Sequence, residues 1–199
     1  SAPAAISTTN FIDADLKKLG FANIAREYFS AGTKDFSALL TKAKQIQPKV
    51  IFCGCYNIEG GLIVRSARAS GVTQPFVSWD VFNTPEVWEI TGPAGNGTVF
   101  VSDPPFEGIP SAKGLVTSLT AEKAQPQTYH FYTYASFQVL QQAVKAAQSL
   151  DPQKVADAIR KGRFDTAIGD ISYSQNGDLK EAKYELYIRK DNQTVPLKE

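Results

Sequence analysis

The chain has 199 residues, of which 43% are hydrophobic, and its formal net charge at pH 7 is +1. This length allows a sizeable core, arranged as one large domain or two small ones. The near-neutral charge, without a dense run of Lys and Arg, argues against a nucleic-acid-binding surface. No apolar run approaches the roughly 18 residues of a membrane span, so we expect no membrane insertion.

The first residues show no targeting signal. The chain contains no Met and begins Ser-Ala-Pro-Ala, without the basic region and apolar stretch of a signal peptide. We interpret it as a processed, trimmed or re-engineered product.

Short apolar runs alternate with amphipathic segments through the first half of the chain. The expected strands are residues 23–29, 50–54, 76–79 and 98–101. Helices are expected at 36–47, which Asp35 or Thr33 can cap, and at 59–69. This alternation predicts a βαβαβ unit with a parallel sheet.

The pattern changes after the proline-rich segment 104–110, which we expect to be a crossing or linker. A largely apolar helix is predicted over residues 131–147. A second helix begins at Asp151, a good N-cap, with Pro152 at its first position.

Two further strands are predicted near the C-terminus. The first covers residues 171–173 and is followed by a polar turn, and the second covers residues 184–190. In the second strand Tyr184, Leu186 and Ile188 alternate with polar residues, which predicts that they form its buried face. We expect this strand to join the sheet of the first half.

Cys53 and Cys55 are the only cysteines. As strand residues two apart they share one face, and we expect two buried, reduced thiols because bonding geometry would be hard to reach. A redox or metal pair is the alternative. His130 is the only histidine, so a Cys/His zinc site lacks ligands, and we predict no metal and no cofactor.

Candidate binding residues follow two neighbouring strands. In open α/β sheets, ligands bind beyond the carboxyl ends of the strands. Tyr56 follows the strand at 50–54, and Asp80 follows the strand at 76–79. The acid could pair with a ligand ammonium while the ring covers an apolar or carboxylate-bearing ligand. Alternatively, Tyr56 packs a loop and Asp80 caps a turn.

Signals for catalysis are weak. Asp80 and Glu86 could form an acid/base pair, but their spacing says little about their distance. No Ser-His pair and no glycine-rich phosphate loop stands out. We therefore expect a protein that is not an enzyme, with no catalytic residues.

Five blocks resemble, in the same order, the branched-chain-amino-acid (Leu/Ile/Val) type of periplasmic solute-binding proteins of ABC transporters. The blocks are EYFSAGTKDFSALLTKAKQI (27–46), VIFCGCYNIEGGLIVRSARASG (50–71), PFVSWDVFNTPEVWEITGPAGNG (75–97), TYASFQVLQQAVKAAQSLDPQKVADAIR (133–160) and FDTAIGDISYSQNGDLKEAKYELYIRK (164–190). The resemblance implies an α/β, type I periplasmic-binding-protein fold. It would comprise a flavodoxin-like three-layer α/β/α lobe with a parallel sheet, plus part of a second lobe.

The resemblance also implies a lobe assignment. Residues 11–105 and 182–199 would form the second, C-terminal ligand-binding lobe. Residues 1–10 and 106–181 would be a remnant of the first lobe, whose opening segment has no counterpart here. In the family, three crossings join two lobes that hold the ligand in the cleft between them.

Specific residues match the positions that contact ligand in the family. Tyr56 matches a tyrosine after the central strand, and Asp80 matches an acidic residue, often Glu, that takes the ligand ammonium. Tyr134 matches a cleft-facing aromatic of the other lobe. Trp79 could favour a larger or aromatic ligand.

The N-terminus departs from the family pattern. Pro3-Ala4-Ala5 resembles a loop that binds the ligand carboxylate and ammonium, but Ile6 stands where a hydroxyl residue is expected. The register could instead place Ser7 there. We therefore include Ala4, Ala5 and Ser7 among the candidate ligand contacts.

The resemblance implies a periplasmic protein, without its signal peptide, that binds a small amino acid or related carboxylate. It would deliver this ligand to an ABC-transporter permease by hinge closure. One alternative is a sensory or regulatory ligand-binding domain of the same fold. Another is an engineered, stand-alone flavodoxin-like domain.

Overall fold

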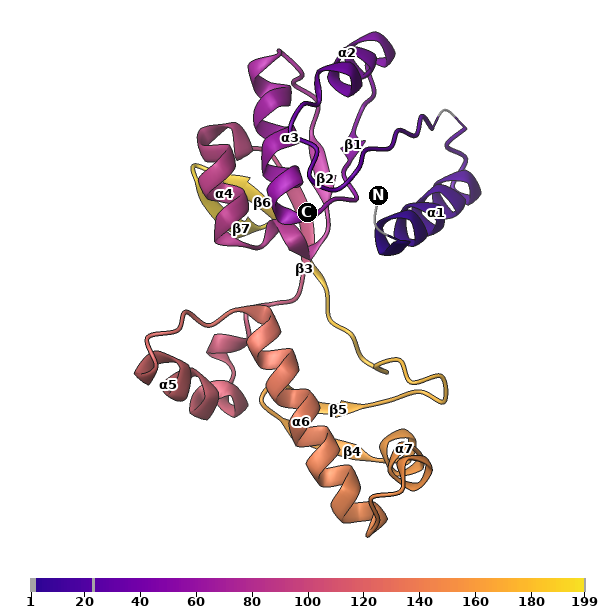
Figure 1. Ribbon diagram of the computed structural model, residues 1–199, viewed down its shortest axis with the longest axis vertical. Coiled ribbons are helices and arrows are strands. Elements are labelled where there is room, and N and C mark those ends of the chain that lie inside the picture. Colours follow the sequence, from indigo (N-terminus) through magenta and orange to yellow (C-terminus); the bar gives the residue numbers. More distant parts are fainter. Residues whose placement is uncertain (1–2, 23, 199) are drawn as a thin grey trace. The chain divides into compact units, whose positions relative to one another are not determined.

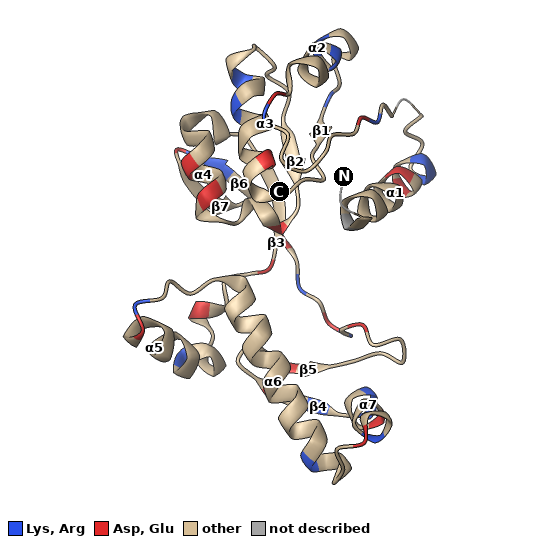
Figure 2. Ribbon diagram, viewed as in Figure 1, with Lys and Arg blue, Asp and Glu red and all other residues tan. Residues whose placement is uncertain are grey.

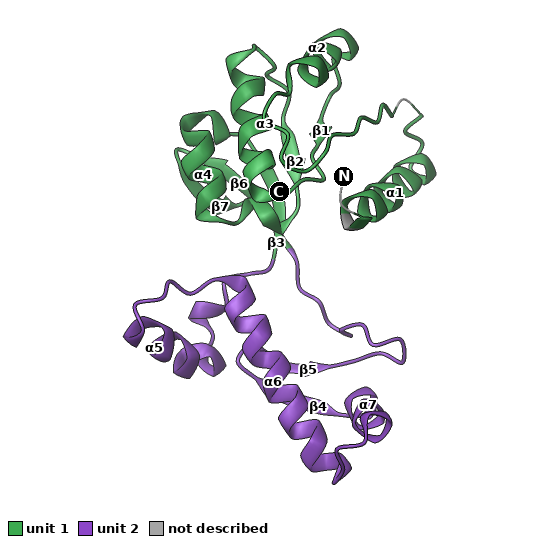
Figure 3. Ribbon diagram, in the orientation of Figure 1, with its two compact units in different colours: residues 1–102, 185–199 green, residues 103–184 purple. Residues whose placement is uncertain are grey.

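The computed structural model describes residues 3–22 and 24–198, and the chain divides into two compact units (Figure 3). Unit 1 comprises residues 1–102 and 185–199, and unit 2 comprises residues 103–184. The chain therefore passes from one unit to the other twice, and unit 2 is inserted into the sequence of unit 1.

Unit 1 is built on a five-stranded sheet in the order β1-β2-β3-β6-β7 (Figure 1). Its strands are β1 (Ile51–Phe52), β2 (Phe76–Ser78), β3 (Val99–Ser102), β6 (Glu185–Lys190) and β7 (Gln193–Pro196). Strands β1, β2 and β3 are parallel, which confirms the predicted parallel sheet, and β6 and β7 add antiparallel strands. The predicted C-terminal strand does join this sheet.

Four α-helices belong to the described part of unit 1. They are α1 (Pro3–Lys18), α2 (Ser37–Ile46), α3 (Asn57–Ala69) and α4 (Pro85–Thr91). Parallel neighbours need crossover connections, and α3 and α4 lie in the two crossovers, from β1 to β2 and from β2 to β3. Short 3-10 turns at Asp80–Phe82 and Gly92–Gly95 complete these connections.

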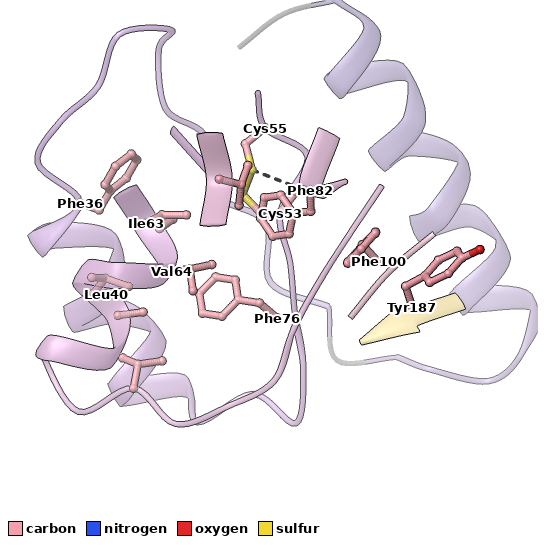
Figure 4. Close-up of a cluster of buried hydrophobic side chains, with 13 residues drawn as sticks. Phe36, Leu40, Cys53, Cys55, Ile63, Val64, Phe76, Phe82, Phe100 and Tyr187 are labelled. Atoms are coloured by element: carbon pink, nitrogen blue, oxygen red, sulfur yellow. Dashed lines mark hydrogen bonds between the residues drawn. A yellow bond between two sulfur atoms is a disulfide. The ribbon is translucent and has the colours of Figure 1, made fainter. Parts of the chain in front are cut away.

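The core of unit 1 joins the sheet to helices α2, α3 and α4, with Leu40, Val64 and Phe76 among its buried side chains (Figure 4). Phe76 and Phe100 are fully buried, whereas Val77 and Val99, which alternate with them, are only partly buried. The ring of Phe100 stacks on Tyr187 of β6 at 5.7 Å between centroids. Burial therefore alternates along β2 and β3, and the buried face of the sheet is the one that packs against the helices.

The predicted buried face of the last long strand is wrong. Leu186 is 46% exposed, while its neighbour Tyr187 is only 7% exposed. The register pairs Tyr187 with Phe100, on the face that the helices cover, and pairs Leu186 with Val101 on the other face. The sequence alternation defines two faces but does not say which of them meets the helices.

The strand predicted at residues 23–29 is also not formed over its described residues, 24–29, and Asn23 lies outside the described part. A strand requires a hydrogen-bonding neighbour as well as alternation, and among residues 3–22 and 24–198 β1 pairs only with β2. Other contacts hold this region. The Phe29 ring meets Phe36 edge-on, and the Gly32 N–H donates to Glu59 of α3 at 2.7 Å.

Neither predicted cap occupies the N-cap position of α2, which is Phe36, but Asp35 binds the first residue of the helix. Its Oδ1 accepts hydrogen bonds from the Ser37 hydroxyl at 2.6 Å and from the Ser37 N–H at 2.9 Å. These bonds lower the pKa of Asp35 because they favour its charged form. The other candidate, Thr33, donates instead to the carbonyl of Ser30.

Unit 2 contains three α-helices and one two-stranded antiparallel sheet. The elements are α5 (Lys113–Ala121), α6 (Thr128–Ala147), α7 (Pro152–Lys161), β4 (Arg163–Thr166) and β5 (Gly169–Ser172), with 3-10 turns at Phe106–Gly108 and Pro110–Ala112. Asp151 caps α7 by accepting the Lys154 N–H at 3.0 Å, as predicted. A small core joins α6, α7 and β4 through Val139, Val155 and Phe164.

Candidate functional site

The candidate site lies where β1 and β2 end. After Phe52 the chain turns through Cys53–Tyr56 into α3, and after Ser78 it turns through Trp79 and Asp80. Because β1 and β2 are parallel neighbours, both turns leave the sheet at the same edge. This edge is the usual place for ligands in open α/β sheets.

Two side chains from the end of β2 bind the turn that follows β1. The Ser78 hydroxyl donates to the carbonyl of Cys53 at 2.8 Å, and the indole Nε1–H of Trp79 donates to the carbonyl of Cys55 at 3.1 Å. The Trp79 ring also meets Phe52 edge-on, 6.1 Å between centroids. The two turns that carry the candidate residues are thus joined by side-chain hydrogen bonds.

Tyr56 is the last residue before α3. Its backbone is extended, with φ −84° and ψ 169°, and its carbonyl accepts the Gly60 N–H at 2.8 Å as the first hydrogen bond of the helix. The side chain is 53% exposed. The fold therefore fixes the Tyr56 backbone while leaving its ring accessible.

Asp80 opens the 3-10 turn Asp80–Phe82 and is half-buried. Its carbonyl accepts the Asn83 N–H at 2.7 Å, and the Asn83 side-chain amide donates to the Ser102 hydroxyl at the end of β3 at 3.1 Å. The turn that carries Asp80 is thereby connected to a third parallel strand.

The expectation of two reduced thiols is wrong, because Cys53 and Cys55 form a disulfide (Figure 4). Strand β1 ends at Phe52, so both cysteines lie in the following turn, where strand alternation no longer sets side-chain directions. Their Cα atoms are 5.5 Å apart, within the range that disulfides span. Each cysteine is 4% exposed.

The predicted binding loop at Pro3-Ala4-Ala5 is a helix instead. Ala4, Ala5 and Ser7 all lie in α1. Alanine is the strongest helix former, and proline is favoured at the first helical position, so local propensity explains the difference. Ala5 is buried and Ser7 is exposed.

Tyr134 lies on α6 of unit 2, with an exposed side chain, whereas the other candidate residues belong to unit 1. Its role as a ligand contact stays a prediction.

Sequence reasoning missed the close packing of α3 at this edge. A Cβ atom added at Gly60 would lie 2.3 Å from the Phe82 ring, and one at Gly61 would lie 2.9 Å from Ile90. The same turn of α3 buries Glu59, whose carboxylate accepts the Gly32 N–H. The paired glycines inside an amphipathic helix were the available signal, because glycine there costs stability unless close packing requires it.

Within residues 3–22 and 24–198, no group of three or more His, Cys, Asp or Glu side chains could hold a metal ion. In the same part of the chain, no helix is long and apolar enough to cross a membrane.

The fold defines an α/β protein with a predominantly parallel sheet and two turns at the carboxyl ends of its strands. The family model described as a periplasmic binding protein matches residues 3–190, and the chain belongs to this family. The resemblance read from the five sequence blocks is confirmed.

Curated relatives and solved structures agree with this assignment. A Leu/Ile/Val-binding protein homolog 1 from Brucella suis is 39% identical over 173 residues, which is 86% of this chain and 47% of that protein. A leucine-binding protein, LivK, from Thermotoga maritima is 31% identical with a TM-score of 0.84, over 96% of this chain and 55% of the other. LivJ from Streptococcus pneumoniae, solved with isoleucine, is 23% identical with a TM-score of 0.71, over 92% of this chain and 55% of the other, and shows the fold alone.

These similarities confirm the predicted type I periplasmic binding fold. The named relatives are solute-binding proteins and not enzymes, in agreement with the expectation for this family. The chain spans about half the length of the curated relatives that it matches, 47% of the first.

Proposed function

We propose that this chain belongs to a solute-binding protein that takes up a small amino acid, or a related carboxylate, for an ABC transporter. The observation that carries the proposal is the 39% identity to a Leu/Ile/Val-binding protein homologue, together with the match to a leucine-binding structure. The family points to the periplasm as the place where the protein acts.

Unit 1 supplies the chemistry of the proposed site. The carboxylate of Asp80 pairs with the ligand ammonium, and the exposed ring of Tyr56 covers the apolar part of the ligand. Trp79, whose indole N–H is bonded to the carbonyl of Cys55, is a further proposed contact. This arrangement suits a ligand with one amine and one apolar side chain.

The lobe assignment and the other contacts are part of the same proposal. Residues 11–105 and 182–199 are proposed as the C-terminal ligand-binding lobe, and residues 106–181 as part of the other lobe. Residues 1–10 were expected in that other lobe, but the structure groups them with unit 1, where α1 runs unbroken from Pro3 to Lys18. Tyr134 of α6, and Ala4, Ala5 and Ser7 of α1, are the further proposed contacts. In the complete protein the ligand lies between two lobes and favours their closed arrangement, which the transporter permease recognises.

The test is isothermal titration calorimetry on the 199-residue chain with leucine and with 4-methylpentanoate, which keeps the carboxylate and apolar chain but lacks the amine. Losing one partner of a desolvated charge pair costs about 2–5 kcal/mol. Asp80→Asn should therefore weaken leucine binding by that amount and leave 4-methylpentanoate binding nearly unchanged.

The matched control is Glu89→Gln, which removes one negative charge from an exposed position on α4. It should leave the affinity for leucine unchanged. If Asp80→Asn binds leucine as tightly as the unmodified chain, Asp80 is only a turn residue. If the chain binds no amino acid, the proposed function is wrong for this chain.

A further inference from the structure

The disulfide lies directly beside the candidate site. Cys55 immediately precedes Tyr56, and the bond joins it to Cys53, the first residue after β1. Both cysteines are buried with 4% exposure, whereas Tyr56 is 53% exposed. A buried covalent link thus sits next to an accessible aromatic side chain.

The backbone of the bridged turn is held on both sides of Gly54. The N–H of Cys53 donates to Val77 of β2 at 2.9 Å, and the Cys53 carbonyl accepts the Ser78 hydroxyl. The Cys55 carbonyl accepts the Trp79 indole N–H. The disulfide links the side chains of the same two residues whose carbonyls accept hydrogen bonds from Ser78 and Trp79.

The sulfur of Cys55 also contacts the start of α3. A Cβ atom at Gly60 would lie 3.2 Å from this sulfur and closer still to Phe82, so the sulfur occupies space next to a glycine that has no side chain. Gly60 in turn donates its N–H to the Tyr56 carbonyl. Tyr56 therefore lies between a cross-linked residue and a helical turn that packs against the cross-link.

A disulfide across one intervening residue closes a very short loop, so it restricts the unfolded chain far less than a long-range bridge does. Its main consequence is expected to be local. We propose that Cys53–Cys55 is a positioning element that holds Tyr56 in the conformation that receives ligand. The test of this inference by leucine affinity rests on the proposed function, whereas the test by hydrogen exchange does not.

Reduction by dithiothreitol breaks the bond without changing the sequence. The S–S bond gains two electrons and two protons from the two thiols of the reagent. Cys53 and Cys55 become thiols, and the reagent becomes a cyclic disulfide. The double variant Cys53→Ser/Cys55→Ser gives a second form without the bond and needs no reductant.

Hydrogen exchange on the full chain is the ligand-independent test. Without the disulfide, through reduction or in the double serine variant, the amides of residues 55–60 should exchange faster. Amides of β3 and α6 should stay as protected as before. Unchanged exchange at residues 55–60 overturns the positioning role, and so does faster exchange throughout unit 1, which would indicate a general structural bond.

The affinity test is a double-perturbation cycle that combines reduction of the disulfide with Tyr56→Ala and measures the affinity for leucine. Coupled residues typically differ from additivity by a factor of about two to about one hundred and fifty in affinity, and for one positioned side chain we expect about fivefold to tenfold. Reduction should weaken leucine binding by this factor in the unmodified chain and in the control Glu89→Gln, and re-oxidation should restore it. In Tyr56→Ala, reduction should cause no further loss.

The outcomes separate the two proposals. An equal loss of affinity in Tyr56→Ala contradicts the positioning of Tyr56, even though the chain binds leucine. Absence of leucine binding in the oxidised chain contradicts the proposed function, and the exchange experiment then decides the positioning role alone. Two free thiols per chain, titrated in denaturant without reductant, would show that the disulfide is not formed.

Discussion

The two units differ in how much apolar surface each sheet can cover. Over the described residues, unit 1 buries 13 residues in its main cluster, between a five-stranded sheet and its helices. The corresponding cluster of unit 2 has four, around a two-stranded sheet. A sheet of two strands offers too little area to cover a long helix. A helix with an apolar sequence can therefore remain largely exposed in unit 2.

Helix α6 shows this disagreement. Between Thr128 and Ala147 its sequence carries no Asp or Glu, and Lys145 is its only Lys or Arg (Figure 2). Phe131 and Val139 are buried on one side of α6, yet Phe137 on another is 68% exposed. In contrast, α3 of unit 1 buries Val64 and Ala67 completely. A nearly uncharged sequence therefore predicts the helix correctly but not how much of it unit 2 covers.

The largest expected effect is in the core of unit 1. Phe100 is fully buried, and its ring contacts those of Trp88 and Tyr187. Phe100→Ala should lower the free energy of unfolding by about 3–5 kcal/mol, the usual cost of a large core truncation. Urea unfolding followed by tryptophan fluorescence measures this, because Trp79 and Trp88, the two tryptophans, both lie in unit 1. A change below 1 kcal/mol would show that this core is not close-packed.

Phe164→Ala tests the smaller core of unit 2. Phe164 is buried among Val139, Ala143 and Val155. The substitution should cost about 3 kcal/mol, the low end of the range for such truncations, because a small cluster can collapse around the cavity. The urea midpoint followed by circular dichroism, which reports on both units, should fall more than the urea midpoint followed by tryptophan fluorescence, which reports on unit 1. If both midpoints fall equally, the units unfold together and the contrast between them has no energetic meaning.

The smallest effect is expected at the exposed face of α6. Phe137→Ser should change the free energy of unfolding by no more than about 0.5 kcal/mol, as for most surface substitutions. Val139→Ala on the buried side of the same helix is the control and should destabilise by about 0.5–3 kcal/mol. If Phe137→Ser lowers the free energy of unfolding as much as Val139→Ala does, the exposed face of α6 is covered in solution.

Local patterns predicted the elements well and their partners less well. Residues 51–52, 76–78 and 99–102 form parallel strands as expected, because continuous apolar runs between amphipathic helices leave few other arrangements. Residues 24–29 have strand-like alternation but no neighbouring strand. For β6, only the register with β3 determines that Tyr187 is the buried residue.

The same distinction holds at the candidate site. The positions of Tyr56 and Asp80 after neighbouring strands follow from the sequence, because strand ends can be recognised locally. The hydrogen bonds from Ser78 and Trp79 to the turn after β1 depend on the register of β1 and β2, which no local pattern specifies. The disulfide was missed because both cysteines were expected to be strand residues that share one face, whereas the strand ends at Phe52.

The most direct test of the proposed site is a titration of the isotope-labelled chain with leucine, followed by amide NMR shifts. The shifts should be largest at residues 54–57 and 79–83, in the two turns that leave the carboxyl ends of β1 and β2. Saturable binding with the largest shifts elsewhere in unit 1, and none in these turns, would contradict the assignment of the site to Tyr56 and Asp80.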